Sequence, residues 1–300
     1  MSQPNDKEIS TYFDFHAPDY HRQYQRGNLE SHATYPANYF RLQIIANRMA
    51  QSNVRRIYEI GVGEGTPLAT LGRMGYEVAG CDVSDAMVAR AKERMGEAGL
   101  SPDAVQWADV QDSLTFANQL RSGPFDAVIA LGVMPHVAND KLFLDNVRML
   151  LRKGGKAFIE FRNKLFSMFT LNRYTKEFIL DDLLAGVADD VKASVAAELD
   201  RRLAVDQPPP RMVLPNGTPG ADAILAKFHN PLTLQDEFAN AGFTGFRIHW
   251  YHFHPAQPML ERTLGARFRE EAMKLEHDAT GWRGLFLCSA GLVEVEKAGE

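Results

Sequence analysis

The chain has 300 residues, a formal net charge of −5 and a hydrophobic content of 45%. This length suits two domains or one α/β domain with an elaboration, and the hydrophobic content is that of a globular protein with a full core. The acidic balance gives no electrostatic footprint for nucleic acid, and no uncharged apolar run of about 18 residues predicts a membrane span.

The cysteines and the first residues indicate a cytoplasmic protein. Cys81 and Cys288 lie far apart among apolar neighbours, which favours buried free thiols in a reducing compartment. Residues 1–8 are polar and contain no apolar signal region. Residues 1–50 form a head that is dense in aromatic residues at 12–20 and has helical spacing of apolar residues at 35–49.

A strand, a glycine-rich turn and a helix follow this head. Residues 56–60 are a short apolar strand containing Glu59, and Gly61, Gly63 and Gly65 come directly after it. Alternate glycines let the backbone turn tightly and approach a ligand, and the helix that begins near residue 66 directs its free N–H groups there. A second strand, residues 76–82, ends at Asp82. An acid about 20 residues after such a turn binds ribose hydroxyls in βαβ nucleotide sites.

The acids of this turn indicate which nucleotide it binds. Glu59 and Glu64 would repel a pyrophosphate but attract a ligand that carries an ammonium and a sulfonium. The turn resembles the first motif of the class I S-adenosylmethionine-dependent methyltransferases, in which it holds the methionine end of the cofactor. The alternative is an ordinary glycine-rich turn of an α/β protein.

The resemblance continues along residues 50–162. Ser84 is a predicted N-cap for a helix over 86–98, and a third strand over 104–109 ends at Asp109. The resemblance implies that Asp109 accepts a hydrogen bond from the adenine amino group; the alternative is a helix cap or turn. Strands over 125–132 and 157–161, a helix over 139–151 and a turn over 153–156 complete the pattern. The predicted cofactor-binding residues are Glu59, Gly61, Gly63, Gly65, Asp82, Val83, Asp109, Val110 and Leu131.

Residues 163–229 interrupt the family pattern. Residues 163–172 are aromatic and apolar, residues 176–203 have helical character with one apolar face, and residues 207–220 are rich in proline and glycine. An insertion after the fifth strand lies over the ligand-binding edge of the sheet, so it is a substrate lid or a dimer arm.

The C-terminal part, residues 230–300, completes the predicted core. It contains a helix over 230–243, a strand over 244–253, a helix over 259–277 and a strand over 285–295. The resemblance implies that the last strand runs antiparallel. The predicted fold is α/β: a seven-stranded, mostly parallel Rossmann-like sheet with helices on both faces. Its parts are a cap (1–50), a cofactor-binding core (51–162), an inserted lid or dimer arm (163–229) and the rest of the sheet (230–300).

Four histidines are candidates for a catalytic base, because an imidazole titrates near neutral pH: His136, His229, His252 and His254. His252 and His254 share a strand face, but no third ligand has metal-site spacing, so we expect no metal and interpret the pair as the wall of an acceptor pocket. Arg173, Tyr174 and Arg211 could hold an anionic acceptor, although surface positions are the simpler interpretation.

The sequence therefore predicts a methyltransferase that uses S-adenosyl-L-methionine and acts on an oxygen or nitrogen of a small molecule. The alternatives are a nucleic-acid or protein methyltransferase and a non-catalytic cofactor-binding protein of the same fold. Glycine spacing disfavours a nicotinamide-dependent oxidoreductase. The expected partners are a small-molecule acceptor and a second copy of the chain bound through the insertion, with no nucleic acid and no membrane. The acceptor, the methylated atom and the identity of the base stay open.

Overall fold

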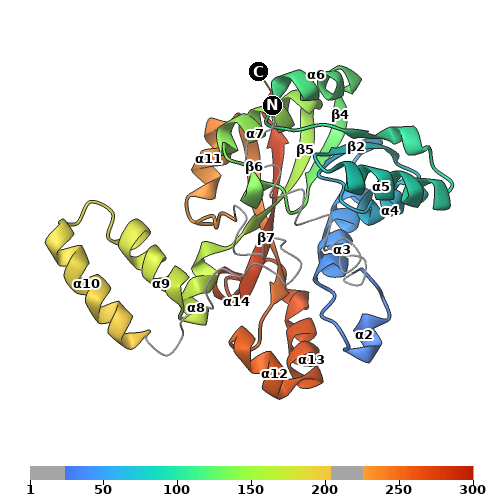
Figure 1. The fold of residues 1–300 in the computed structure, drawn as a ribbon. Coiled ribbons are helices and arrows are strands. Elements are labelled where there is room, and N and C mark those ends of the chain that lie inside the picture. The colour runs from blue at the N-terminus through green and yellow to red at the C-terminus, as the bar shows by residue number, and fades with distance from the viewer. Residues whose placement is uncertain (1–23, 204–225, 300) are drawn as a thin grey trace.

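The computed structural model describes residues 24–203 and 226–299. The described residues form one seven-stranded sheet in the order β3-β2-β1-β4-β5-β7-β6, in which β7 runs antiparallel to both neighbours (Figure 1). The strands are β1 Arg56–Ile60, β2 Glu77–Asp82, β3 Val105–Trp107, β4 Phe125–Ala130, β5 Leu151–Arg162, β6 Phe243–Phe253 and β7 Cys288–Lys297. The predicted fold class and the antiparallel last strand are confirmed.

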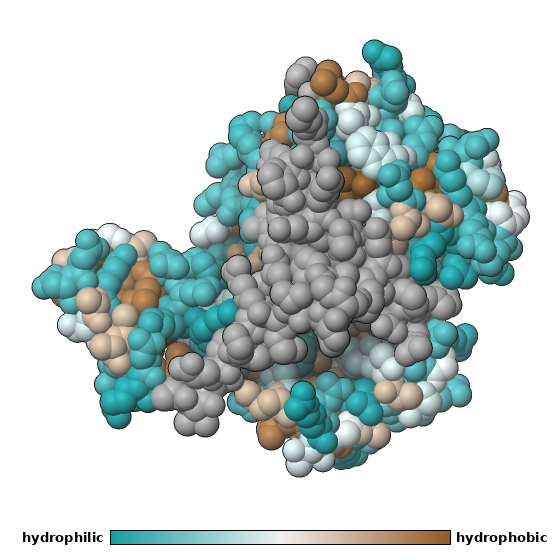
Figure 2. Space-filling model, in the orientation of Figure 1, coloured by the Kyte–Doolittle hydropathy of each residue, from teal (hydrophilic) through white to brown (hydrophobic). Residues whose placement is uncertain are grey.

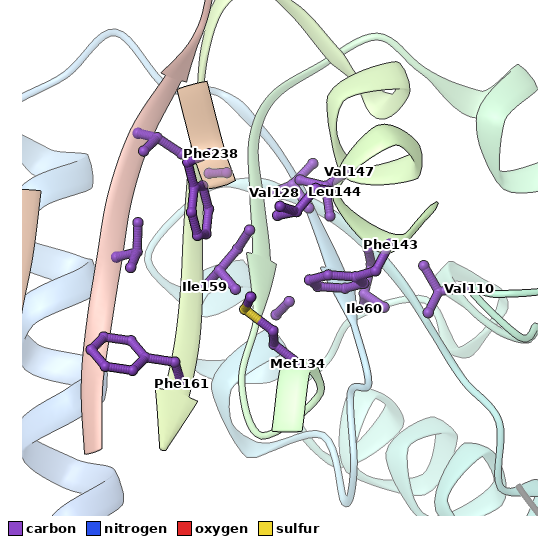
Figure 3. Close-up of a cluster of buried hydrophobic side chains, with 14 of the residues drawn as sticks. Ile60, Val110, Val128, Met134, Phe143, Leu144, Val147, Ile159, Phe161 and Phe238 are labelled. Atoms are coloured by element: carbon purple, nitrogen blue, oxygen red, sulfur yellow. The ribbon is translucent and has the colours of Figure 1, made fainter. Parts of the chain in front are cut away.

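Helices cover both faces of the sheet because the buried strands alternate their side chains between the two faces. On β4, Val128 and Ala130 face one cluster, whereas Ala127 and Ile129 face the other. Figure 3 shows the first cluster, in which Phe143 and Val147 of one helix and Phe238 of another pack against the sheet. The helices of this face are α6 Ser113–Ser122, α7 Asp140–Leu150 and α11 Leu234–Asn240. Those of the opposite face are α3 Ala37–Ala50, α4 Thr66–Arg73 and α5 Asp85–Glu97.

Ser84 begins α5 as the sequence predicts. Its hydroxyl accepts the N–H of Met87 at 3.1 Å, which satisfies one of the free donors of the first turn. The apolar side chains Val88, Ala91 and Met95 of this helix then pack against α4. Both cysteines are free and buried, as predicted.

Several boundaries differ from the predicted ones. Residues 153–156, which the sequence predicts to form a turn, lie inside β5. Gly154 has φ +65° there, and the pairing of β4 with β5 shifts its register between Phe125 and Ala127. The expected helix over 259–277 is divided at Gly265, whose backbone (φ 55°, ψ −127°) no helix can contain. Its parts are α12 Glu261–Leu264 and α13 Ala266–Leu275. The start of the last predicted strand is the short helix α14 Gly284–Leu287.

The described residues 164–203 form a helical arm that projects from the body of the molecule (Figure 1). It contains α8 Ser167–Thr170, α9 Arg173–Glu177, a π-helical segment Phe178–Leu183 and α10 Asp189–Arg202. The expected continuous helix over 176–203 is interrupted after Leu183, near Gly186 at φ +80°. The prediction that one face of this helix packs on the protein is also wrong for its second half, because none of the residues of α10 is buried. Two apolar side chains of the arm, Leu183 and Val191, are exposed. Figure 2 shows brown, hydrophobic surface on the arm.

A short helix, α2 Asn28–Ser31, precedes α3. The aromatic segment 12–20 and the proline-rich segment 207–220 lie outside the described residues. Within the ranges that are described, no helix has the length and apolar character needed to cross a membrane.

Candidate active site

A cavity of about 620 Å³ lies at the edge of the sheet where the parallel strands end. Its glycine-turn wall comes from the ends of β1, β2 and β4 and from the segment after β3. Its arm wall comes from the end of β5, the start of the arm, Phe228, the end of β6 and the start of β7. Open α/β sheets bind ligands at this edge, so the topology alone places the two walls together. The cavity lining includes the predicted cofactor residues Glu59, Gly61, Gly63, Asp82, Val83, Asp109, Val110 and Leu131.

The glycine turn is fixed by hydrogen bonds to the end of β2. The backbone N–H groups of Gly61 and Val62 donate to the carbonyl of Cys81 at 2.8 and 3.0 Å, and the N–H of Gly63 donates to Oδ2 of Asp82 at 2.8 Å. Gly63 has φ +53°, and a Cβ built there would meet no atom within 4 Å. The turn therefore leaves at Gly63 a space that only a glycine keeps open.

Gly65 is the one predicted cofactor residue that the cavity lining lacks. It stands at φ +89° before α4, and a Cβ there would lie 2.9 Å from the Cα of Ala91 in α5. Close packing between two helices accounts for this glycine.

Asp82, the last residue of β2, and Asp109, two residues after β3, organise the adjoining loops. Oδ1 of Asp82 accepts the N–H of Ser84 at 2.9 Å, and Oδ1 of Asp109 accepts the N–H of Gln111 at 2.8 Å. The Gln111 side chain accepts the N–H of Ala138 at 2.6 Å and so joins this loop to the one after β4. Both acids are buried and both line the cavity.

Glu59 provides a test of which ligand the glycine-turn wall fits. Its side chain is only 1% exposed, and its Oε2 has no hydrogen-bond partner among the described residues. Burial raises the pKa of Glu59 well above its usual range; the Asp82 and Glu64 carboxylates add to this, and Arg41 opposes it. A ligand with a positive group would compensate this carboxylate, whereas a pyrophosphate would not. The wall therefore fits S-adenosylmethionine.

Sequence reasoning missed a buried ion pair in the cavity wall. Arg41 of α3 pairs with Glu160 of β5 and donates to the hydroxyl of Tyr24 at 2.9 Å, and Glu160 and Tyr251 both line the cavity beside it. The signal was present in the sequence: Arg41 stands four residues from Ala37 and from Ile45, on the buried face of its helix.

The arm wall is aromatic and hydrogen-bonding. Its aromatic part includes Phe166, Tyr174 and Phe228, and the last two rings are 4.6 Å apart. Asn163 holds the start of the arm against α14, because its Nδ2 donates to the carbonyls of Leu285 and Cys288 at 2.8 Å each. Sequence reasoning did not single out Asn163 or Phe166.

The four candidate histidines separate into two groups. His136 and His252 line the cavity, whereas His229 and His254 do not. His229 lies 3.4 Å from a carboxylate oxygen of Asp140. His254 packs against Phe166, with ring centroids 4.7 Å apart, and follows the end of β6. The rings of His252 and His254 are neighbours at 4.7 Å, as the shared strand face predicted.

His252 stands in a strained and crowded position. Its φ is +63°, its Nδ1 lies 2.8 Å from the hydroxyl of Ser289, and Tyr35 stacks on its ring. Its backbone N–H donates to Glu276 at 2.8 Å. Burial, with smaller contributions from His254 and Arg41, lowers the pKa of His252 to about 3. This imidazole is therefore neutral at physiological pH.

The remaining predictions about the site concern a metal and an anionic acceptor. Across residues 24–203 and 226–299, no group of three or more His, Cys, Asp or Glu side chains is arranged to hold a metal ion. Tyr174 lines the cavity, Arg173 donates to the Tyr174 hydroxyl at 2.6 Å without lining it, and Arg211 lies outside the described residues.

Comparison with known sequences agrees with this geometry. Residues 58–157 match a methyltransferase domain family. The ubiquinone biosynthesis O-methyltransferase of Maricaulis maris is 34% identical over 125 residues, which cover 42% of this chain and 44% of that protein. The enzyme of the same name from Nitrobacter winogradskyi is 31% identical over 150 residues, covering 49% and 53%. The chain thus spans about half the length of these curated relatives.

Solved structures show the same fold. Magnesium protoporphyrin IX methyltransferase from Synechocystis, with bound S-adenosylhomocysteine, aligns with a TM-score of 0.52 at 14% identity, covering 98% of this chain and 100% of that one. Phosphoethanolamine N-methyltransferase 2 from Haemonchus contortus, in complex with S-adenosylmethionine, aligns with a TM-score of 0.50 at 14% identity, covering 95% and 57%. S-adenosylmethionine is the cofactor of these methyltransferases. The sheet order, the acidic glycine turn, the match over residues 58–157 and these relatives together support assignment of the chain to the class I S-adenosylmethionine-dependent methyltransferases.

Proposed function

We propose that this protein transfers a methyl group from S-adenosylmethionine to an oxygen of a small molecule. The observation that carries the proposal is a cavity in which an acidic glycine-turn wall faces an aromatic, hydrogen-bonding arm wall. One wall suits a cationic cofactor, and the other suits an organic acceptor. Methylation of nitrogen has the same geometric requirements, and the names of the sequence relatives favour oxygen.

Three carboxylates would hold the cofactor. Glu59 would compensate the positive methionine end, Asp82 would accept the ribose hydroxyls, and Asp109 would accept from the adenine amino group. When bound, S-adenosylmethionine supplies a methyl group on a sulfonium. The chain's task is to hold the acceptor oxygen near that methyl in a cavity that excludes water.

Among the four histidines, His136 is the base that we propose. It is buried in the loop after β4 and lines the cavity. His229 and His254 lie outside the lining, and His252 binds a proton too weakly to act efficiently near neutral pH. His252 and Ser289 would instead position the acceptor through hydrogen bonds.

The arm supports two further proposals. Its first part lines the cavity and would act as a substrate lid, whereas α10 buries nothing and would pack on a second copy of the chain. We also propose the four-part division of the chain at residues 50, 162 and 229. A cytoplasmic location and no binding of nucleic acid complete the proposal; the acidic net charge supports the latter.

Calorimetry and an acceptor screen test the function. S-adenosylmethionine and S-adenosylhomocysteine should bind with micromolar dissociation constants, and NAD should bind much more weakly. With a labelled methyl donor, transfer should occur to hydroxylated small molecules and not to oligonucleotides. Tighter binding of NAD, or transfer only to nucleic acid, would contradict the proposal.

A further inference from the structure

Arg162 occupies a defined place in the arm wall. It ends β5, where it pairs with Ala290 of β7, and Ala290 in turn pairs with Tyr251 of β6. Alternation along β5 places Arg162 on the same face as Glu160, and all four residues line the cavity. The Arg162 side chain therefore extends from a row of three paired strands, which is a rigid base for binding.

The charges around Arg162 are already paired with other groups. Glu160 pairs with Arg41, and Lys164 pairs with Asp182 of the arm. His252 is neutral. Among residues 24–203 and 226–299, by contrast, the Arg162 guanidinium has no hydrogen-bond or ion-pair partner. The described part of the wall thus carries one uncompensated positive charge. The Arg162 guanidinium that carries it offers five hydrogen-bond donors in a planar fork.

The two walls of the cavity therefore differ in charge. The glycine-turn wall contains Glu59, Glu64, Asp82 and Asp109, whereas the only carboxylate among the described residues of the arm wall is Glu160, which is paired. An acceptor with an ionised carboxylate would balance Arg162, and one with an ammonium would be repelled. One guanidinium matches one monovalent carboxylate in charge and in bidentate geometry. The rings of Phe166, Tyr174 and Phe228 supply flat apolar surface for the rest of the acceptor.

We propose that Arg162 binds the carboxylate of the methyl acceptor, and that the acceptor is an aromatic carboxylate with a hydroxyl group. This assignment rests on the proposed methyl transfer and adds the substrate class to it. Arg162 is a binding residue that fixes the orientation of the ring in the cavity.

Binding of two isosteric probes tests the assignment without knowledge of the natural acceptor. The dissociation constants of 4-hydroxybenzoate and 4-hydroxybenzamide are measured by ligand-observed NMR on the full chain with saturating S-adenosylhomocysteine. The wild type should bind the carboxylate about tenfold or more tightly than the amide, because a charge-assisted pair is formed. Arg162→Gln should abolish that preference, and Arg162→Lys should keep part of it.

Arg247→Gln is the matched control. Arg247 is an exposed arginine of β6 that lies outside the cavity lining and has no hydrogen-bond or ion-pair partner in the part of the chain that the structure describes, so its replacement removes the same charge without touching the site. The control should keep the wild-type preference. Equal binding of the two probes by the wild type, or an unchanged preference in Arg162→Gln, would overturn the assignment. Phenyl phosphate serves as a dianionic probe. If it bound more tightly than 4-hydroxybenzoate, the assignment of a monovalent carboxylate to the acceptor would also be contradicted.

The same samples separate this inference from the proposed function. If S-adenosylhomocysteine itself does not bind the wild type, the proposed methyl transfer fails. If it binds and the carboxylate preference is missing, the role of Arg162 fails alone.

Discussion

The carboxylate of Asp82 joins the end of β2 to the glycine turn after β1, because its Oδ2 accepts the N–H of Gly63 at 2.8 Å. Its other oxygen accepts the N–H of Ser84 at 2.9 Å. Each carboxylate oxygen can accept a second hydrogen bond, so Asp82 can hold the turn and a ribose hydroxyl at the same time. This double role determines how its replacement should affect the protein.

Asp82→Ala should weaken the binding of S-adenosylmethionine by about 10- to 100-fold, which corresponds to the loss of hydrogen bonds to a charged acceptor. The fold should persist, because the side chain lies at a strand end. Calorimetry of the folded variant measures the loss, and the exposed Asp103→Ala serves as control. Wild-type affinity in a folded Asp82→Ala variant would show that the ribose binds elsewhere.

Gly63→Ala should reduce cofactor affinity far more than it reduces stability. The new methyl would occupy the open space of the turn. Gly99→Ala is a strict control, since Gly99 also has positive φ (+73°) and no atom within 4 Å of a built Cβ, yet lies outside the cavity lining. Both variants should lose about 1 to 2 kcal/mol of unfolding free energy from left-handed strain. Thermal unfolding and cofactor titration compare them, and equal cofactor affinities would refute a role for Gly63.

Glu59 should make cofactor binding dependent on pH. Burial raises the pKa of Glu59 in the free protein, so below that pKa a cationic ligand has to displace its proton. Affinity should therefore rise with pH, by up to about tenfold per unit, until Glu59 is ionised in the free protein. Glu59→Gln should bind more weakly and without this rise, whereas the exposed Glu93→Gln should behave as the wild type. Calorimetry in buffers of different ionisation enthalpy should detect the released proton.

The histidines are tested by single replacements with Gln. His136→Gln should lower the methyl-transfer rate by roughly 10²–10⁴ and recover partly at high pH, as expected for loss of a general base. His252→Gln should mainly raise KM for the acceptor. His229→Gln and His254→Gln should retain cofactor binding and most of the rate. If His136→Gln has the wild-type rate, proximity alone drives transfer.

Glu276 should make the stability of the fold depend on pH. Burial raises its pKa from 4.5 to about 7, although it accepts the backbone N–H groups of His252 and Phe253. The folded state keeps this proton longer than the unfolded chain, so the unfolding free energy should fall as pH rises from 4.5 to about 7. Glu276→Gln should remove roughly 2 to 3 kcal/mol of that fall. Urea unfolding at several pH values measures it; a pH profile parallel to that of the wild type would contradict the assignment.

Local chemistry made much of the cofactor half of the site predictable. The glycine turn, Asp82 and Asp109 lie in one continuous segment, each at or just after the end of a strand, and parallel strands bring such ends to one edge. Gly65 shows the limit of this reasoning. It continues the alternate spacing of Gly61 and Gly63, but a glycine is needed there because the backbone of Ala91, which lies in α5 and 26 residues later in the sequence, is too close for a Cβ.

The acceptor half depends on contacts between distant segments, which spacing does not report. Arg41 meets Glu160 only because α3 covers the face on which β5 directs its even-numbered residues. His252 meets Ser289 across an antiparallel pair whose register is set by a bulge between Thr244 and Arg247. The histidines could be nominated from the sequence, but their separation into cavity-lining and outlying pairs required the fold.

The antiparallel pairing of β5 with β7 has a consequence for how the chain is made. Residues 163–287 separate the two strands, so during synthesis β5 has a partner on one side only until the chain passes Cys288. Until then the edge that carries Phe158 and Phe161 is open to pairing with other chains. A chain truncated before Cys288 should therefore aggregate, even though it retains every predicted cofactor-binding residue.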